Sequence, residues 1–254
     1  MSVQQKIDEV ADGKSTVLQL QYMRMSSLPV ISHLTLLQEL LVTGAGLRAL
    51  PILPSGLRTL CASYNDLRTL PTLPSTLQTL DISHNCIHTL PDLPSGLRWL
   101  YIHHTKIQVL PDLPSGLQEI YAGNGDIQTI PDLPQTLQTL YVFDNKLQML
   151  PKLPLKLQEL SISYNNLGFL PDLSHLAHLR CIIIGNNPFT HSHINNAVLS
   201  CVLDKVSFSQ CDIDAFNAAI LLFSDKTTYF SLLPRDVTNI IKGYISYVPV
   251  VLKK

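Results

Sequence analysis

Three histidines have the residue type and the spacing to hold a metal ion. His84 and His104 are twenty residues apart, and His103 directly precedes His104. Imidazole nitrogens are common zinc ligands, and Asp144 would add a carboxylate oxygen. A functional metal centre also needs residues that orient its ligands, and the sequence pattern supplies none. We therefore predict no metal site and no cofactor.

Nucleophilic and phosphate chemistry have little support in the sequence. The patterns GxGxxG, GxxxxGK followed by Ser or Thr, and GxSxG do not occur, and no clustered carboxylate pair suggests acid–base work. Cys211 lies next to Asp212, but Ser209 and Asp212 have the spacing of a helix capping box. We interpret Cys211 as a helix residue near a cap, and we predict that the protein is not an enzyme.

Charge and hydropathy exclude several classes of partner. Lys and Arg number 18 against 19 Asp and Glu, and no basic stripe indicates a nucleic-acid binder. The N-terminal residues 1–14 lack the apolar segment of a secretory signal peptide, and apolar runs such as AAILLF at 218–223 are too short to span a membrane. The five cysteines form no CxxC pair, which favours free thiols in a reducing compartment.

A twenty-residue repeat must position all of these side chains. The pattern LxxLxVxxNxLxxLPxLPxx recurs in consecutive units that begin at Leu57, Leu77, Leu97, Leu117 and Leu137. A related unit begins at Leu37, units of twenty-two residues begin at Ser15 and Leu157, and a shortened ninth unit begins at Leu179. Self-similarity over this many units predicts a solenoid, in which each repeat packs on its neighbours.

Each unit reads as a short strand, a turn and an extended return. In residues 97–102 the apolar Leu100 and Ile102 alternate with Trp99 and Tyr101, which is the period of a strand. The asparagine at the ninth position, such as Asn85, is expected to satisfy backbone groups buried between repeats. The prolines of LPxLP exclude a regular helix. We predict an α/β fold, a curved solenoid with a parallel sheet on its concave side and an extended, Pro-rich convex side.

The open ends of such a sheet need caps. Residues 1–14 are predicted to form an N-terminal capping helix, and residues 15–190 are predicted to form the solenoid of about nine repeats. Helical periodicity returns after residue 190, with Val237, Ile241 and Tyr244 on one side of the last segment. We therefore expect residues 191–254 to form a C-terminal helical cap.

The LxxLxVxxNxLxxLPxLPxx unit resembles the bacterial LPX class of leucine-rich repeats, over roughly residues 15–190. That class occurs in YopM-like and IpaH-like effectors and in leucine-rich-repeat effectors of Legionella. The resemblance implies a leucine-rich-repeat scaffold in a bacterial virulence effector, secreted by a type III or type IV system into the host cell, where the host cytoplasm is the expected location. The C-terminal VPVVLKK is compatible with a type IV translocation signal.

A ubiquitin-ligase component is the alternative function. IpaH-like ligases carry their catalytic cysteine in a CxD motif of a large helical domain, whereas Cys211 begins only a CxxD, and only residues 191–254 follow the repeats. The stretch LPRDVTNIIKGYI at 233–245 is similar to the opening of an F-box, without its second half. Under this alternative the C-terminal helices recruit the ligase machinery and expose Val237, Ile241 and Tyr244, whereas a cap buries them.

Aromatic residues at outward positions of the strands are the main candidates for binding. Tyr101, Tyr121 and Tyr141 share the fifth position of adjacent repeats, with Trp99 and Phe143 beside them. Pairing across strands explains part of this pattern, but exposed aromatic clusters usually mark interfaces. We predict that the concave face binds one folded protein, from the host or the bacterium, and that the unbound chain is a monomer. The predicted partner-binding residues are Tyr64, Asp81, Trp99, Tyr101, His103, His104, Glu119, Tyr121, Tyr141, Phe143, Asp144 and Glu159.

Two further patterns bear on this surface. The asparagine series is interrupted by Thr105 and Gly125, where the aromatics are densest, and also by Ala45. Acidic residues rim the predicted patch and favour an electropositive partner.

A separate acidic stripe on the convex side, formed by the aspartates of the LPDL motifs, is interpreted as a solubilising face. Its members are Asp92, Asp112, Asp132 and Asp172.

Overall fold

The computed structural model describes residues 2–171, 173 and 175–188. This part of the chain contains one α-helix and nine strands of three residues each. The elements in chain order are α1 (Val3–Ala11), β1 (Val17–Gln19), β2 (Glu39–Leu41), β3 (Thr59–Cys61), β4 (Thr79–Asp81), β5 (Trp99–Tyr101), β6 (Glu119–Tyr121), β7 (Thr139–Tyr141), β8 (Glu159–Ser161) and β9 (Cys181–Ile183).

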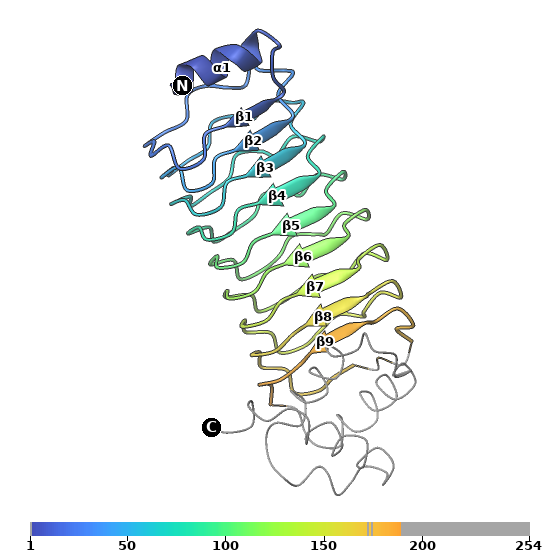
Figure 1. The fold of residues 1–254 in the computed structure, drawn as a ribbon. Helices are drawn as coiled ribbons and strands as arrows, with labels where there is room; N and C mark the ends of the chain where they lie inside the picture. The colour runs from blue at the N-terminus through green and yellow to red at the C-terminus, as the bar shows by residue number, and fades with distance from the viewer. Residues whose placement is uncertain (1, 172, 174, 189–254) are drawn as a thin grey trace, which may run out of the picture.

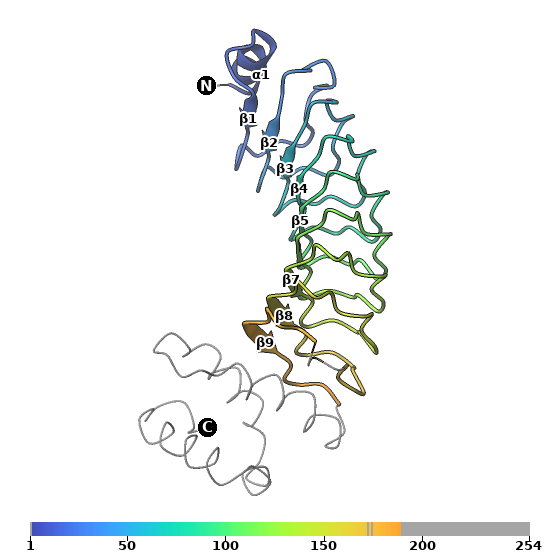
Figure 2. The same cartoon turned by 90° about the vertical axis from the view of Figure 1, so that its right-hand side faces the viewer.

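The nine strands form one parallel sheet in which each strand pairs with the next along the chain. The register is the same at every step, so that the third, fourth and fifth residues of one repeat face their counterparts in the next; Leu80, for example, pairs with Leu100. The strands follow one another in a row (Figure 1), and the turned view shows them along the inner side of an arc (Figure 2). The predicted leucine-rich-repeat solenoid, with its parallel sheet on the concave side, is confirmed.

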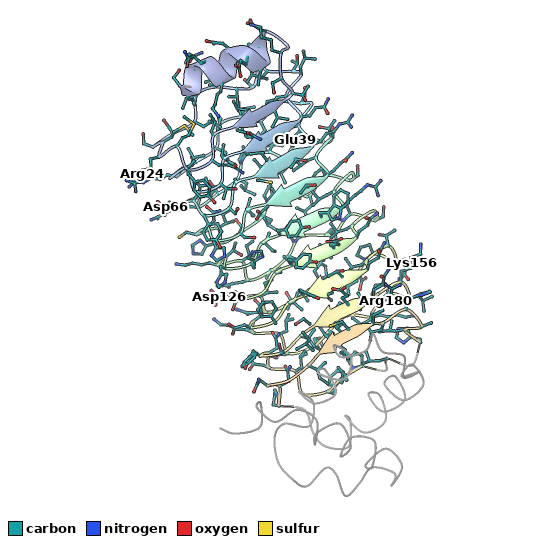
Figure 3. The ribbon with its side chains drawn as sticks, viewed as in Figure 1. Arg24, Glu39, Asp66, Asp126, Lys156 and Arg180 are labelled. Carbon is teal, nitrogen blue, oxygen red and sulfur yellow. The ribbon has the colours of Figure 1, made fainter. Side chains whose placement is uncertain are left out.

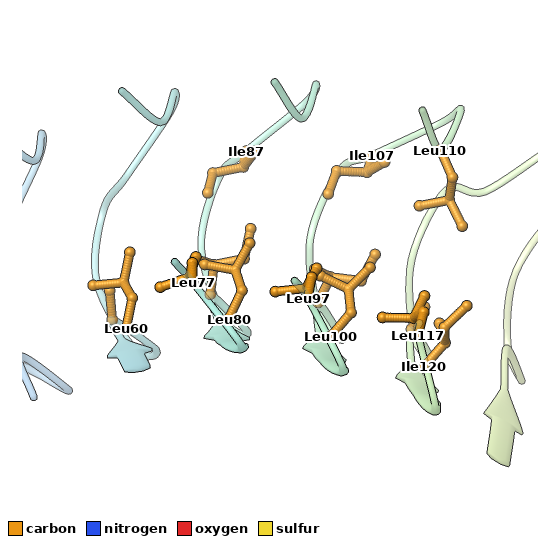
Figure 4. Packing of buried hydrophobic residues seen from close by; sticks show 14 of the residues in the cluster. Leu60, Leu77, Leu80, Ile87, Leu97, Leu100, Ile107, Leu110, Leu117 and Ile120 are labelled. Atoms are coloured by element: carbon orange, nitrogen blue, oxygen red, sulfur yellow. The ribbon is translucent and has the colours of Figure 1, made fainter. Parts of the chain in front are cut away.

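The core consists of leucine and isoleucine side chains that stack in rows along the solenoid. The central residue of each strand is buried, and its two neighbours point outward. Leu60, Leu80, Leu100 and Ile120 form one such row, and Leu77, Leu97 and Leu117 form another (Figure 4). Each fully buried side chain contributes on the order of 2 kcal/mol through removal of apolar surface from water. Identical spacing in every repeat therefore produces one continuous core.

The asparagines at the ninth position tie neighbouring repeats together. Asn85 Nδ2 donates to the carbonyls of Ile82 and Ser83 in its own repeat and to Ala62 in the repeat before. Its Oδ1 accepts from the Leu67 N–H at 2.9 Å. The same set of contacts recurs at equivalent positions, at Asn65, Asn145, Asn165 and Asn187. The predicted role of these amides between repeats is confirmed.

The convex side follows an extended path, as the prolines of LPxLP predict. Leucines of this path still reach the core, since Leu73 and Leu133 are buried and Leu93 packs against the core while half-buried. A tight turn after the second proline returns the chain to the next strand, with the Leu97 N–H donating to the Pro94 carbonyl. The single α-helix described in this chain therefore lies outside the repeats.

Helix α1 covers the first strand of the sheet. Ser2 is its N-cap and forms a capping box with Gln5, which satisfies two backbone groups. Ile7 and Val10 are buried against the core, and Lys6 Nζ donates to the Gln19 carbonyl at 2.8 Å. The helix lies within the region predicted as an N-terminal cap. The predicted C-terminal cap at 191–254, the F-box-like stretch and Cys211 lie outside the described residues.

No helix within the described residues is long and apolar enough to cross a membrane.

Candidate functional site

The centre of the concave face is a row of three tyrosines on adjacent strands. Tyr101 pairs in register with Tyr121, and Tyr121 pairs with Tyr141. The rings of Tyr101 and Tyr121 are stacked with centroids 5.0 Å apart, and Tyr141 meets Tyr121 edge to face at the same separation. Aromatic pairs at this distance attract one another. Each ring is half-buried, so the row is also accessible from solvent.

Glutamates at the third position of the following strand accept hydrogen bonds from two of these tyrosines. The Tyr141 hydroxyl donates to Glu159 Oε2 at 2.6 Å, and the Tyr101 hydroxyl donates to Glu119 Oε2 at 3.5 Å. Burial, reinforced by the nearby carboxylate of Glu119, raises the pKa of Tyr101 to about 12. Burial and the bond to Glu159 raise the pKa of Tyr141 as well. The phenols of Tyr101 and Tyr141 therefore remain protonated and donate these hydrogen bonds at neutral pH.

Trp99 and Phe143 flank the tyrosine row, but neither is fully exposed. Trp99 pairs in register with Glu119, and Phe143 lies over Gly123. A Cβ at position 123 would approach the Phe143 ring to 2.5 Å, so glycine is what allows this close contact. Both aromatic side chains are half-buried. Both side chains were predicted to be exposed, but each is partly covered, and Phe143 is covered in part by the repeat that contains Gly123.

A second line of side chains follows the eighth position, just after each strand. Tyr64, His84 and His104 have φ angles of 55°, 54° and 53°, in the left-handed region that residues other than glycine rarely adopt. Their rings are stacked, with centroids 4.0 Å apart between Tyr64 and His84 and 4.2 Å apart between His84 and His104. The left-handed backbone aims all three rings to the same side.

His103 completes a cluster of three imidazoles. Its ring lies edge-on to His84 at 5.5 Å, and its Nδ1 lies 3.2 Å from the Ser83 hydroxyl. Burial lowers the pKa of both His84 and His103, and the neighbouring imidazoles lower it further, while Asp81 opposes the shift. No group of three or more His, Cys, Asp or Glu side chains suited to a metal ion occurs among the residues that the structure describes. Asp144, also at an eighth position, is exposed.

The predicted residues thus divide into two adjoining groups. Those at the outward positions of the strands form the concave centre: Asp81, Trp99, Tyr101, His103, Glu119, Tyr121, Tyr141, Phe143 and Glu159. Those at the eighth position, Tyr64, His104 and Asp144, lie along the turn that follows the strands. Their assignment to partner binding remains a prediction.

Sequence reasoning missed two features of this surface. The left-handed backbone at the eighth position is one, although Asn124, Asp144 and Asn186 at equivalent positions belong to residue types that tolerate it. The other is the environment of the Cys61 thiol on β3, which is free as the sequence predicts, but whose pKa rises to about 11 because of burial and the nearby Asp81. This thiol is consequently a poor nucleophile at neutral pH.

The residues that interrupt the asparagine series, Thr105 and Gly125, replace the hydrogen bonds of asparagine to different extents. Thr105 Oγ1 donates to the Ile102 carbonyl at 2.8 Å and thus replaces one of the asparagine bonds within its own repeat. Gly125 has no side chain, and a Cβ there would lie 3.0 Å from Asn145 Oδ1. The asparagine bonds across repeats are therefore missing on both sides of the repeat that carries Tyr101.

Comparison with known proteins identifies leucine-rich repeats at two places in the chain. Leucine-rich-repeat family models match residues 74–89 and 156–176. A search of curated protein sequences found no match.

Solved structures extend this similarity to most of the chain. The leucine-rich-repeat domain of a Shigella effector is 27% identical, with a TM-score of 0.60, and the alignment covers 81% of this chain and 84% of that one. YopM from Yersinia enterocolitica is 30% identical with a TM-score of 0.50, and the alignment covers 65% of this chain and 45% of YopM. The functional domain of InlJ from Listeria monocytogenes, 23% identical with a TM-score of 0.61 over 70% of this chain and 40% of that one, shows the shared fold alone. The fold is one whose curved concave surface serves protein binding.

Proposed function

We propose that the chain is a non-enzymatic effector whose concave face binds a folded partner protein and thereby inhibits, recruits or sequesters it. The observation that supports the proposal is the tyrosine row at the centre of that face, with Trp99 and Phe143 at its sides. Binding hot spots are enriched in tyrosine and tryptophan that are packed yet accessible. Core packing does not require these rings, because buried residues such as Leu100 and Ile120 complete the core beneath them.

The bacterial origin and the destination in a host cell rest on similarity. The Shigella structure that this chain resembles is described as the leucine-rich-repeat domain of an effector. We accordingly propose secretion by a type III or type IV system into the host cytoplasm, an LPX-class repeat, and a chain that is monomeric before it binds. Recruitment of a ubiquitin ligase through residues 233–245 concerns a segment outside the described residues, and no observation favours it here.

The test compares proteins captured from host-cell and bacterial lysates by the parent chain and by three variants. Trp99→Ala and Tyr121→Ala truncate the concave centre, and Asp132→Ala changes an exposed convex residue as the control. Each aromatic truncation is expected to cost about 2 kcal/mol of binding, a loss of about thirtyfold. The cost in folding stability is about 1 kcal/mol, because side-chain packing between neighbouring strands contributes roughly that much.

A protein captured by the parent and by the control, and lost from both aromatic variants, would support the proposal. If both aromatic variants bind and melt like the parent while the convex variant loses binding, the concave face is the wrong surface.

A further inference from the structure

The outward strand positions of the concave face have a one-sided charge. The third, fifth and seventh positions of the nine repeats, all of which the structure describes, contain no lysine or arginine. Their carboxylates are Glu39, Asp81, Glu119 and Glu159. Positively charged side chains lie beyond the ends of the strands. Arg180, for example, directly precedes β9, and Figure 3 shows it beside Lys156 on the side where the strands start.

The central carboxylates lack a cationic partner within the described residues. The ion pairs found there are Lys14 with Asp12 and Lys146 with Asp126, none of them at an outward strand position. Glu119 and Glu159 each accept one tyrosine hydroxyl and are half-buried. An ionised carboxylate has room for about four hydrogen bonds. Each glutamate therefore keeps most of its capacity to accept from a partner.

The middle tyrosine differs from its two neighbours. Tyr101 and Tyr141 reach a glutamate on the following strand, but the residue that Tyr121 would reach is Thr139, which is buried. The Tyr121 hydroxyl consequently has no hydrogen-bond partner among the described residues. Every fully buried side-chain nitrogen or oxygen within the described residues has a hydrogen-bond partner, so this hydroxyl is open to solvent and available to a group on a bound protein. Tyr121 lies between the two Tyr–Glu pairs.

We infer that this Tyr–Glu row, Tyr101, Glu119, Tyr121, Tyr141 and Glu159, binds arginine side chains presented by a basic surface of the partner protein. A guanidinium group stacks on aromatic rings and donates forked hydrogen bonds to carboxylates, and the row supplies both within one surface. Lysine carries the same charge but lacks the planar fork. The row spans β5 to β8, roughly 14 Å at the spacing of paired strands, which is wide enough for one helix or strand of the partner. The inference rests on the proposed function and specifies the chemistry of the partner.

A titration with short peptides tests the inference on the full chain. The probes are a capped hexa-arginine peptide, a hexa-lysine peptide and a hexa-glutamate peptide. The fluorescence of Trp99, the single tryptophan of the chain, reports on this surface, and calorimetry gives an independent affinity. Hexa-arginine should bind at low salt and release at high salt, because screening weakens exposed charge pairs. Hexa-lysine should bind several-fold more weakly, and hexa-glutamate should not bind.

Three variants locate the binding. Glu119→Gln with Glu159→Gln removes both charges but keeps an oxygen for each tyrosine, and should weaken hexa-arginine at least about tenfold. Tyr121→Leu should weaken it about fivefold through loss of the central ring. Asp112→Asn with Asp132→Asn removes the same charge from the exposed convex side and should leave affinity unchanged. Circular dichroism checks that each variant is folded, and the single glutamate variants replace the double one if it unfolds.

The inference is overturned if the glutamate variant binds hexa-arginine like the parent, if the convex control weakens binding equally, or if hexa-lysine binds as tightly as hexa-arginine. A captured partner separates the two proposals. If Trp99→Ala and Tyr121→Ala abolish capture while the glutamate variant retains it, the concave interface stands and arginine recognition fails. If the aromatic variants retain capture, the proposed interface itself fails.

Discussion

At the scale of the residue, the eighth position of each repeat concentrates unusual backbone geometry. Nine residues other than glycine have positive φ within the described chain, and most of them occupy this position. The strain of about 1 kcal/mol per residue is offset by regular hydrogen bonds, such as that from the His84 N–H to the His103 carbonyl at 2.9 Å. The rings of Tyr64, His84 and His104 are thereby fixed side by side. The backbone conformation at the eighth position is thus the same in most repeats, while the side chain that it carries differs from repeat to repeat.

The histidine cluster predicts a stability that depends on pH. In the folded chain the pKa of His84 and of His103 lies below the ordinary value of 6.5, because burial and neighbouring imidazoles disfavour the charged form. The unfolded chain therefore binds more protons between the two pKa values, and the free energy of unfolding falls as pH drops from 6.5 toward the folded-state pKa. Above pH 6.5 this contribution is fully present.

Urea titrations at a series of pH values between about 8 and 5.5 measure this effect. The variant His84→Gln with His103→Gln should show a shallower decline than the parent, and His178→Gln, at an exposed position, should decline like the parent. Equal slopes for the parent and the double variant would contradict the assignment.

At the scale of the element, the asparagine series joins neighbouring repeats in addition to the pairing of the strands. Each strand has only three residues, whereas Asn85 alone makes four hydrogen bonds across two repeats. These bonds satisfy carbonyls and N–H groups that the turn would otherwise leave buried without partners. Where the asparagine is absent, at Thr105 and Gly125, the repeats depend on their apolar rows and strand pairing.

Changing this position should alter stability in both directions. Asn85→Ala leaves the Leu67 N–H without its side-chain acceptor and should cost about 3 kcal/mol. Thr105→Asn should add about 1 kcal/mol, because an amide there repeats the geometry of Asn85 and accepts from the Ile87 N–H. Asn166→Ala, at an exposed position, is the matched control with little expected change.

Denaturant unfolding of the three variants provides the measurement. A neutral effect of Asn85→Ala would show that the lateral bonds are dispensable. A destabilised Thr105→Asn would mean that threonine is required at this site for another reason.

At the scale of the whole molecule, the solenoid is nearly one-dimensional. Every strand pairs only with its neighbours in sequence, and the same register recurs at each step. Helix α1 closes one end by burying Ile7 and Val10 against the first repeat. Stability in such a fold is approximately a sum over repeats and the interfaces between them. One consequence is that a repeat can be removed as a unit.

Deletion of residues 57–76 should yield a folded protein. Gly56 would then precede Leu77, β2 would pair with β4, and Asn85 would take the place of Asn65 against the Val42 carbonyl. We expect the melting temperature to fall by several degrees, since one repeat and one interface are lost. Binding of hexa-arginine should persist, because β5 to β8 are untouched.

Removal of only residues 57–66 is the control, since it removes β3 but leaves half a repeat of extra chain between β2 and β4, which disrupts the pairing of these two strands. Circular dichroism melts compare the two deletions. Equal damage from both would argue against a modular solenoid.

How much the sequence predicts depends on whether an interaction is local and repeated. The period of twenty residues, the alternation at Leu100 and Ile102, and the prolines of LPxLP together predicted the sheet, its concave position and the extended convex side, because each repeat packs only on its neighbours. The row of Tyr101, Tyr121 and Tyr141 followed from the same register. Because the register is constant, residues at the same position of successive repeats lie side by side on the sheet.

The tertiary structure alone decided how those side chains meet. The bonds of Tyr101 to Glu119 and of Tyr141 to Glu159, and the lack of such a bond at Tyr121 within the described part of the chain, depend on side-chain rotamers and on the depth to which each ring is covered. These are set by contacts between repeats, which no single repeat's sequence encodes. The sequence by itself determined which residues share the concave face; the packed solenoid determined that its tyrosines are half-buried donors and its glutamates open acceptors.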